Sequence, residues 1–578
     1  MGFQDNCLKA ILALMALAGS YVAAESPPPL TWVTASMGKC RASGLKCTST
    51  VLSVPATYKP VGGSVKLFVK RYMTAGAKTA ERHLIMLPGG PGQDESVLEG
   101  HAGNIATYAG VPVAIYLTDM RGVGQSQAFV RPDDSSWLNS LDSVASSAPF
   151  PLNSINMTNV AMDVLQLGKA IRDSPEFGSG AKLGIFGVSF GGTWAYRALQ
   201  LDEGKIFDFA VLDSMAATSE GFTDPKNDST FLRNCDSHPF CKAQFNGDVN
   251  NARKWLAEIV DPKTNGCAAA LSATLSSGKY VEEANMGNRL LWLFQDFLEG
   301  KETMEPDGRY HSAMVVLAFI KATHQCRDLA AYSGILKSMA SGISSLTASA
   351  RARPVFPTTR AGGEAQYNRI VNYFLFCEEA FNLPGGGDGD CKASTITAQC
   401  MLRSAYMNIF SFIRSFVSAR DPISGRGYSG GAKVYFVHGE ADLVTPYPTV
   451  ERLASKTSGS RKITYRNFGH SIITNSPCAA PTWKEILGGG SSSTTDGCLA
   501  KVNSAPLEWT FKRYPKYRAW WDPSISPDDH QMTEPDMSSV GGGGGIPWVP
   551  IVIALIVLLA SGGGFFFWKT KKAATKQS

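Results

Sequence analysis

The feature that most constrains the fold is an apolar stretch that runs into a glycine-rich turn, Leu183-Gly-Ile-Phe-Gly-Val-Ser-Phe-Gly-Gly192. When a strand turns tightly into a helix, the residue at the turn takes a strained backbone conformation, and its neighbours must lack side chains for the turn to close. The pattern Gly187-x-Ser189-x-Gly191 therefore predicts a strand, a sharp turn and a helix, with Ser189 as a candidate nucleophile. An ordinary glycine-rich turn is the alternative interpretation.

Short apolar runs recur along the chain on both sides of this turn, as expected for a chain with 44% apolar and 18% charged residues. The runs cover residues 65–69, 83–87, 113–118, 183–188, 207–212, 434–438 and 463–465. Several are separated by helical patterns, for example at 160–171 and 193–200. This alternation predicts an α/β fold, with a mostly parallel sheet and helices on both of its faces.

The alternation of strand and helix patterns stops between residues 214 and 427. Amphipathic helical patterns such as 288–298 and 312–321 are interleaved there with most of the cysteines. A segment of this length between two strands is too long for a loop. We therefore expect a largely helical lid at 214–427, inserted between two parts of one α/β core at 25–213 and 428–537.

The two ends of the chain carry targeting patterns. Residues 1–24 combine an apolar run with small residues at Val22-Ala23-Ala24 and predict a secretory signal, with an uncleaved anchor as the alternative. After a Gly/Ser linker at 538–545, residues 546–568 contain no charge and are long enough to span a membrane. The basic tail at 569–578 favours a type I single-pass topology, with the globular part extracellular or in a secretory or vacuolar lumen. A glycolipid-anchor signal is the alternative.

The net charge of +6 gives no ground for a nucleic-acid partner, because four lysines of the tail carry most of it. Twelve cysteines are present, and in an exported domain they favour disulfides. Close spacing makes the pairs Cys40 with Cys47, Cys235 with Cys241, and Cys478 with Cys498 plausible. The cysteine and histidine spacing does not suggest a metal site. Asn156-Met-Thr and Asn227-Asp-Ser match the glycosylation motif.

A serine hydroxyl needs a base to take its proton and a carboxylate to orient that base. Where the serine lies on a strand-to-helix turn, these partners follow it in the chain as an acid and then a histidine. Asp442 follows the apolar run at 433–438, and His470 comes 28 residues later, after the run at 463–465. We interpret them as the catalytic acid and base, with Asp213 as the competing acid and a structural loop histidine as the alternative for His470.

Acyl transfer also needs hydrogen-bond donors for the oxyanion that develops on the substrate. The backbone N–H of Phe190 directly follows the serine and is one candidate. Leu87-Pro-Gly89-Gly90-Pro-Gly follows a predicted strand and suggests a second donor, from Gly89 or Gly90. A plain tight turn is the alternative.

Taken together, these motifs resemble the α/β-hydrolase serine exopeptidases, the family of prolyl iminopeptidases and tripeptidyl aminopeptidases. The resemblance spans roughly residues 30–515 and rests on the Ser189 turn and on Gly89–Gly92, Asp119–Ser126, Gly439–Asp442 and Gly469-His470. The residues around the serine and the cysteine-bearing lid look closer to the secreted tripeptidyl branch. The resemblance implies release of one or a few residues from a free peptide N-terminus through an acyl-enzyme, without a cofactor. Within Asp119–Ser126 we interpret Asp119 and Arg121 as an ion pair that braces the oxyanion loop, with direct substrate contact as the alternative.

An exopeptidase must recognise a free α-amine, and a partly desolvated carboxylate does so by pairing with the ammonium. The lid candidates are Glu378 with Glu379 and Glu282 with Glu283. The first pair resembles the Cys-x-acid element of tripeptidyl aminopeptidases, which by position selects Glu379. Two solvated glutamates on a helix face are the alternative.

Two other classes of function stay open. One is an esterase or lipase-like hydrolase, because triad chemistry does not choose between esters and amides. The other is a catalytically silent surface module that keeps the fold.

Overall fold

The computed structural model describes residues 27, 29–34, 45–129, 145–146, 148–202, 204–222, 224–260, 312–325, 368–382, 410–411, 413–466, 468–473, 476–504 and 521. All of them belong to the first of two compact units, which comprise residues 1–528 and 529–578. The predicted signal, linker, membrane span and tail lie outside the described residues, as do the predicted helix at 288–298 and the Glu282–Glu283 pair. No helix within the described part of the chain is long and apolar enough to cross a membrane.

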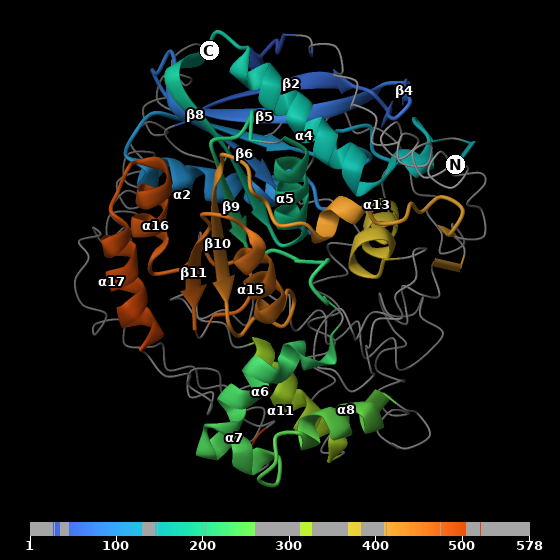
Figure 1. The fold of residues 1–578 in the computed structure, drawn as a ribbon, viewed down its shortest axis with the longest axis vertical. Coiled ribbons are helices and arrows are strands. Elements are labelled where there is room, and N and C mark those ends of the chain that lie inside the picture. Colours follow the sequence, from blue (N-terminus) through green and yellow to red (C-terminus); the bar gives the residue numbers. More distant parts are fainter. Residues whose placement is uncertain are drawn as a thin grey trace, which may run out of the picture. The chain divides into compact units, whose positions relative to one another are not determined.

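The centre of the molecule is a nine-stranded sheet (Figure 1). In spatial order its strands are β1 (Val33–Thr34), β2 (Leu45–Val54), β5 (Val65–Thr74), β7 (Val113–Thr118), β6 (Ala80–Leu87), β8 (Phe177–Val188), β9 (Phe209–Asp213), β10 (Lys433–Gly439) and β11 (Arg461–Tyr465). The strands from β7 to β11 are parallel to one another, whereas β1, β2 and β5 pair in antiparallel fashion. Strands β3 (Thr57–Tyr58) and β4 (Val61–Gly62) form a separate pair. The predicted α/β class with a mostly parallel sheet is confirmed.

Helices cover both faces of this sheet (Figure 1). Ile85 and Leu87 of β6 pack into the same apolar cluster as helices α4 (Met157–Arg172) and α5 (Phe190–Asp202). The alternate residues of β6, Leu84 and Met86, pack on the other face with α2 (Glu99–Ala109) and α16 (Ala479–Leu487). Because side chains alternate along a strand, a strand that is covered on both faces reads as a continuous apolar run.

Between β9 and β10, the secondary-structure elements that the structure describes are all helices. The elements there are η4 (Pro225–Asp228), α6 (Ser229–Asp236), α7 (Pro239–Gln244), α8 (Asn251–Val260), α11 (Ser312–His324), α13 (Arg369–Leu375), the π-helix η7 (Phe376–Ala380) and η8 (Pro422–Gly425). The expected helix at 312–321 is thus present. The boundaries of the lid stay a prediction.

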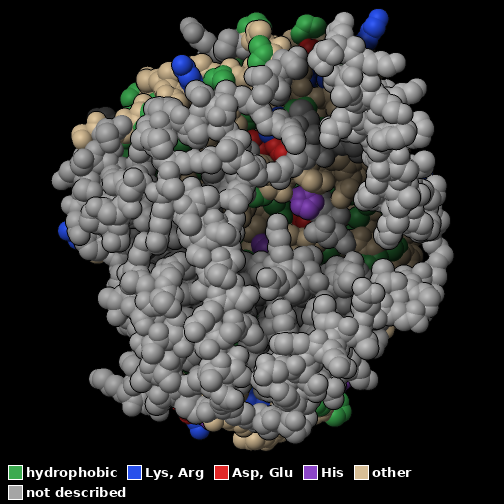
Figure 2. Space-filling model, turned by 180° about the vertical axis from the view of Figure 1, so that it is seen from behind, with side chains coloured by type: hydrophobic (Ala, Val, Ile, Leu, Met, Phe, Trp, Pro, Cys, Tyr) green, Lys and Arg blue, Asp and Glu red, His purple; other side chains and the backbone are tan. Residues whose placement is uncertain are grey.

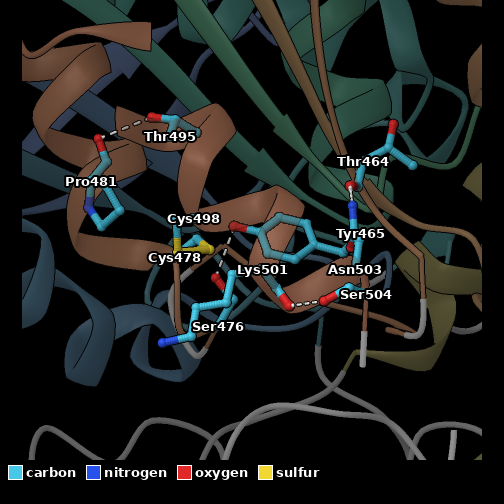
Figure 3. The surroundings of a disulfide bond; sticks show 10 residues. All are labelled: Thr464, Tyr465, Ser476, Cys478, Pro481, Thr495, Cys498, Lys501, Asn503 and Ser504. Carbon is cyan, nitrogen blue, oxygen red and sulfur yellow. Dashed lines mark hydrogen bonds between the residues drawn. A yellow bond between two sulfur atoms is a disulfide. The ribbon is translucent and has the colours of Figure 1, made fainter. Parts of the chain in front are cut away.

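Disulfides join two of the predicted cysteine pairs. Cys235 pairs with Cys241 at the end of α6, and Cys478 pairs with Cys498. Figure 3 shows the second disulfide, which ties the start of α16 to α17 (Ser492–Asn503) beside Tyr465 of β11. Cys47 is also disulfide-bonded, and its partner lies outside the described residues, so its pairing with Cys40 stays a prediction.

The two glycosylation motifs differ in their surroundings. Asn227 is 3% exposed, and its Nδ2 donates to the carbonyl oxygens of Gly221 and Phe222. A glycan on this nitrogen does not fit the fold, so the motif at Asn227 is a false signal. Asn156 is partly exposed and caps the N-terminus of α4.

Candidate active site

Ser189 lies on a sharp turn between β8 and α5, as the sequence predicts. Its φ of 58° is in the left-handed region, which non-glycine residues seldom adopt. A Cβ on Gly187 would lie 2.1 Å from the Gly191 carbonyl oxygen, and one on Gly191 would lie 2.3 Å from the Leu87 carbonyl oxygen. The turn therefore requires glycine on both sides of the serine. Ser189 is partly exposed, and α5 begins at the next residue, so the positive end of the helix dipole lies beside it.

The acid and base candidates meet at the same edge of the sheet. Asp442 follows β10 and His470 follows β11, and the two strands pair up to Gly439 and Tyr465. His470 Nδ1 lies 2.9 Å from Asp442 Oδ2. Asp213, the competing acid, is the last residue of β9 and instead accepts hydrogen bonds from the backbone N–H groups of Ile472 and Ile473. Asp442, rather than Asp213, is therefore the carboxylate that hydrogen-bonds with the His470 ring.

Asp442 is buried, and its charge is well supported. Its Oδ1 accepts from the N–H groups of Val444 and Thr445, each at 2.8 Å. Burial alone raises the pKa of a carboxyl group, but the proximity of His470 and these hydrogen bonds outweigh burial and hold the pKa of Asp442 below its ordinary value. His470 keeps 12% of its side chain exposed. Figure 2 shows a hollow in one face of the molecule, with histidine and acidic side chains inside it.

The predicted oxyanion loop lies directly against the nucleophile. A Cβ on Gly89 would lie 2.9 Å from the Cβ of Ser189 and 3.4 Å from its Oγ. Gly90, the next residue, has a φ of 108°. Phe190 follows Ser189 on the other side, and its ring packs against Phe376 of η7 at a centroid distance of 5.7 Å. Two of the three residues predicted to stabilise the oxyanion therefore lie beside Ser189: Gly89 across the loop and Phe190 next in the chain.

These features, together with the strand order, decide the fold. The fold is that of the α/β-hydrolases. In sequence, the family described as "TAP-like protein" matches residues 415–498, a stretch that includes Asp442 and His470. None of the curated proteins compared with the chain matches it.

Three solved structures illustrate the structural comparison. A peroxisomal α-beta-hydrolase from Saccharomyces cerevisiae is 13% identical, with a TM-score of 0.34, covering 81% of this chain and 92% of the other. A proline iminopeptidase from Mycobacterium smegmatis is 11% identical, with a TM-score of 0.34 and coverages of 78% and 99%. The ferulic-acid-bound Est1E from Butyrivibrio proteoclasticus is 11% identical, with a TM-score of 0.30 and coverages of 74% and 95%.

The proposed ion pair between Asp119 and Arg121 is wrong. Arg121 pairs with Asp163 of α4, through Nη2 to Oδ1 at 2.6 Å and Nε to Oδ2 at 2.8 Å. Asp119 accepts from the N–H groups of Glu95 and Gln125, each at 2.8 Å. Because Glu95 closely follows the oxyanion loop in the chain, Asp119 still braces that loop, through backbone hydrogen bonds.

The two lid glutamates are buried, which contradicts the alternative of a solvated helix face. Glu379 Oε1 lies 3.0 Å from Arg197 Nη2 of α5, and its Oε2 accepts from Thr218 Oγ1 at 3.2 Å. Glu378 Oε2 accepts from the N–H of Met157, at the start of α4. Burial, and then the neighbouring Glu379, raise the pKa of Glu378 well above its ordinary value. The two carboxyl groups therefore anchor η7 to helices of the core.

Two polar residues near Asp442 were given no role in the sequence analysis: Thr445 of the same loop and His438 of β10. Thr445 Oγ1 lies 2.7 Å from Asp442 Oδ2 and 3.1 Å from His470 Nδ1. His438 Nε2 lies 2.6 Å from the Thr445 carbonyl oxygen, so it carries the proton and holds the turn from β10. Asp-Leu-Val-Thr is readable as a turn in which the Asp accepts the N–H groups two and three residues on, and that signal would have found Thr445.

Proposed function

We propose that the protein is a serine hydrolase in which Ser189, His470 and Asp442 form the catalytic triad. The observation that carries this proposal is the 2.9 Å hydrogen bond between His470 Nδ1 and Asp442 Oδ2, beside the strained turn at Ser189. A proton on Nδ1 that is donated to Asp442 leaves Nε2 as the acceptor for the serine proton. The fold supports the same proposal, because its known members carry their nucleophile on this turn.

In this mechanism Ser189 Oγ attacks the substrate carbonyl carbon while His470 takes the hydroxyl proton. The negative charge that develops on the carbonyl oxygen is stabilised by the N–H of Phe190 and by an N–H of Gly89 or Gly90. His470 then returns the proton to the leaving group, which departs and leaves an acyl-enzyme. Water, activated by the same histidine, releases the acyl group and restores Ser189.

The substrate class that we propose is peptides with a free N-terminus, from which one or a few residues are released. Two observations support it: the motif resemblance to exopeptidases, and the TAP-like match over residues 415–498. In this proposal Glu379 is the residue that recognises the α-amine. A carboxylate has about four lone-pair sites, so Glu379 is able to accept an ammonium in addition to Arg197 and Thr218.

An esterase is the second candidate, and one observation favours it. Arg197 neutralises Glu379, and Arg197 Nη1 has no hydrogen-bond partner among the described residues. The small cavity that these two residues line therefore carries a cation beside its carboxylate. A site of this kind gives an ammonium less attraction than a lone carboxylate does, whereas a neutral ester needs no such attraction.

The location that we propose is a type I single-pass membrane protein with the hydrolase unit outside the cytoplasm. It follows from the sequence patterns at 1–24, 546–568 and 569–578. The disulfides Cys235–Cys241 and Cys478–Cys498 support an oxidising compartment.

A substrate panel tests the proposed activity. Purified protein and its Ser189→Ala variant are assayed on fluorogenic peptides with free N-termini, on the same peptides with blocked N-termini, and on a short-chain ester. We expect Ser189-dependent turnover of the free peptides and little turnover of the blocked ones. Turnover of the ester alone would assign the esterase, and a purified wild-type protein that is inactive on the whole panel would favour the silent module.

A further inference from the structure

The dipeptide Asp213-Ser214, at the end of β9, contacts the segments of all three triad residues. It lies between β8, which leads to Ser189, and β10, which leads to Asp442. The Asp213 carbonyl oxygen accepts from the N–H of Ser189 at 2.9 Å, so the strained turn of the nucleophile is bonded to this dipeptide. Ser214 has a φ of 49°, another left-handed value for a residue with a side chain. Backbone strain of this kind persists only where surrounding contacts hold it.

The side chains of the dipeptide hold the loop that carries His470, called the histidine loop below. Ser214 Oγ accepts from the N–H of Ser471 at 2.8 Å. Asp213 Oδ1 accepts from the N–H of Ile472 at 3.1 Å, and its Oδ2 accepts from the N–H of Ile473 at 3.0 Å. Three successive backbone amides that follow the histidine are thus bound by two adjacent side chains.

The turn from Asp442 to Thr445, called the acid turn below, is held by the same dipeptide. Thr445 Oγ1 lies 2.8 Å from the Ser214 carbonyl oxygen and 2.7 Å from Asp442 Oδ2. The hydroxyl has a single proton, which it donates to one of these two oxygens at a time. The position of Thr445, and through it that of the Asp442 carboxylate, is therefore fixed relative to Ser214.

We propose that Asp213 and Ser214 are positioning residues that keep the nucleophile, the acid turn and the histidine loop in register, and that Asp213 must be ionised to do so. A carboxylate accepts both amides with charge-assisted hydrogen bonds, whereas a protonated carboxyl presents a hydroxyl to one of them. This inference rests on the proposed serine-hydrolase function, because register matters only if the three residues act together.

The surroundings of Asp213 place this ionisation in an accessible pH range. The side chain is 1% exposed, and burial raises its pKa to about 6, against the lowering effect of the amides of Ile472 and Ile473 and of His470. The titratable groups of the neighbouring elements are Tyr465 of β11, His470 beyond it, and His438 and Asp442 of β10 and its loop. We therefore expect protonation of Asp213 to loosen the histidine loop as the pH falls through about 6.

The test compares Asp213→Asn with the matched control Asp202→Asn. Asp202 is also buried and accepts from two successive backbone amides, those of Ile206 and Phe207, but it is the last residue of α5 and lies before β9, whereas Asp213 is the last residue of β9. For Asp213→Asn we expect a loss of about 10- to 100-fold in kcat with little change in KM, the size typical of residues that orient catalytic groups. We expect Asp202→Asn to retain the wild-type kcat.

Two readouts separate positioning from general stability. The wild-type profile of kcat/KM against pH should show a downward step near pH 6 in addition to the ionisation of the catalytic histidine, and Asp213→Asn should lack that step. Amide hydrogen exchange at Ile472 and Ile473 should be faster in Asp213→Asn and unchanged in Asp202→Asn. The proposal would be overturned if Asp213→Asn kept the wild-type kcat and if its kcat/KM decreased at low pH in the same way as that of the wild type.

If Asp213→Asn does not fold, Ser214→Ala replaces it. This variant removes the acceptor for the Ser471 amide and the hydroxyl that donates to Asp213 Oδ1 at 3.2 Å, and we expect it to reduce kcat about 10-fold; full activity would overturn the role of Ser214. A wild-type protein without any Ser189-dependent activity would refute the proposed function. The exchange measurement would still decide whether Asp213 holds the histidine loop.

Discussion

Gly89 touches Ser189 so closely that a single added methyl group would lie 2.9 Å from the Ser189 Cβ. Gly89→Ala should therefore push the oxyanion loop away from the nucleophile. We expect kcat to fall by about 10²- to 10³-fold, the usual cost of losing one oxyanion donor, with a smaller change in KM. The control is Gly100→Ala in α2, where an added Cβ meets no atom within 4 Å. Equal activity of the two variants would contradict the assignment of this loop.

Removal of either Ser189 or His470 should abolish turnover. Triad members act as a unit, so Ser189→Ala and His470→Ala should each reduce kcat by on the order of 10⁶. Asp442→Asn should reduce kcat by about 10⁴, because it favours the wrong tautomer of His470. Steady-state kinetics and circular dichroism of the purified variants provide the measurement. Substantial activity in Ser189→Ala would refute the hydrolase proposal, and a larger loss in Asp213→Asn than in Asp442→Asn would move the catalytic acid to Asp213.

Glu379 and Glu378 provide a matched pair for the recognition of the substrate amine. Glu379→Gln should raise KM for free peptides by about tenfold or more, which corresponds to roughly 1.4 kcal/mol, and should barely change hydrolysis of a neutral ester. Glu378→Gln should have little effect on either substrate, because the raised pKa of Glu378 already favours its neutral form. Equal losses on peptide and ester in Glu379→Gln would instead indicate that breaking its pair with Arg197 displaces η7.

Truncation after Met537 tests the proposed location. The truncated chain keeps all the described residues and lacks the predicted span, so it should be secreted as a soluble and active enzyme. Fractionation of cells and medium, followed by the activity assay, measures this. Active truncated protein that still sediments with membranes would show that another anchor exists.

His83 should make stability depend on pH without affecting catalysis. It is buried in β6, its Nδ1 lies 2.9 Å from the Tyr116 hydroxyl, and burial lowers its pKa from 6.5 to about 4. The unfolded state then binds the proton more readily, so stability is complete above pH 6.5 and falls as the pH drops towards 4. The expected loss is about 3 kcal/mol across this window. Denaturant unfolding of the wild type and of His83→Gln at pH 7 and pH 4.5 measures it, and an equal pH dependence in both proteins would contradict the assignment.

The sequence predicts the parallel strands well for a physical reason. Strands β6 to β10 are covered on both faces, so each contains an unbroken run of buried residues, whereas in β11 only Ile463 and Tyr465 are buried. Strand β2 was missed, because its buried positions include Thr48 and Thr50 while Val51 is exposed, so apolar residues do not mark its buried face. Its partner β5 supplies the pairing that makes it a strand, and no local pattern shows that pairing.

The candidate site also contains some residues that local sequence predicts and others that it does not. Ser189, Asp442 and His470 each follow a strand that the sequence predicts, so local sequence was enough to select them. The partners of Arg121 and Glu379 were not predictable, because Asp163 and Arg197 come from helices that only the folded chain brings close. Burial of Glu379 was hidden for the same reason, since a Glu-Glu pair on a helix normally indicates a solvated face.

The sheet also fixes the spacing of two strand ends that are far apart in the chain. Strands β9 and β10 pair directly, with Asp213 opposite Val437, although more than 200 residues of the chain lie between them. The spacing of the strand ends that carry the acid and the base is set by backbone hydrogen bonds within the sheet. The spacing of these two strand ends is therefore independent of the length of the chain that joins them, so that insertions or deletions beyond Ser214 would leave it unchanged.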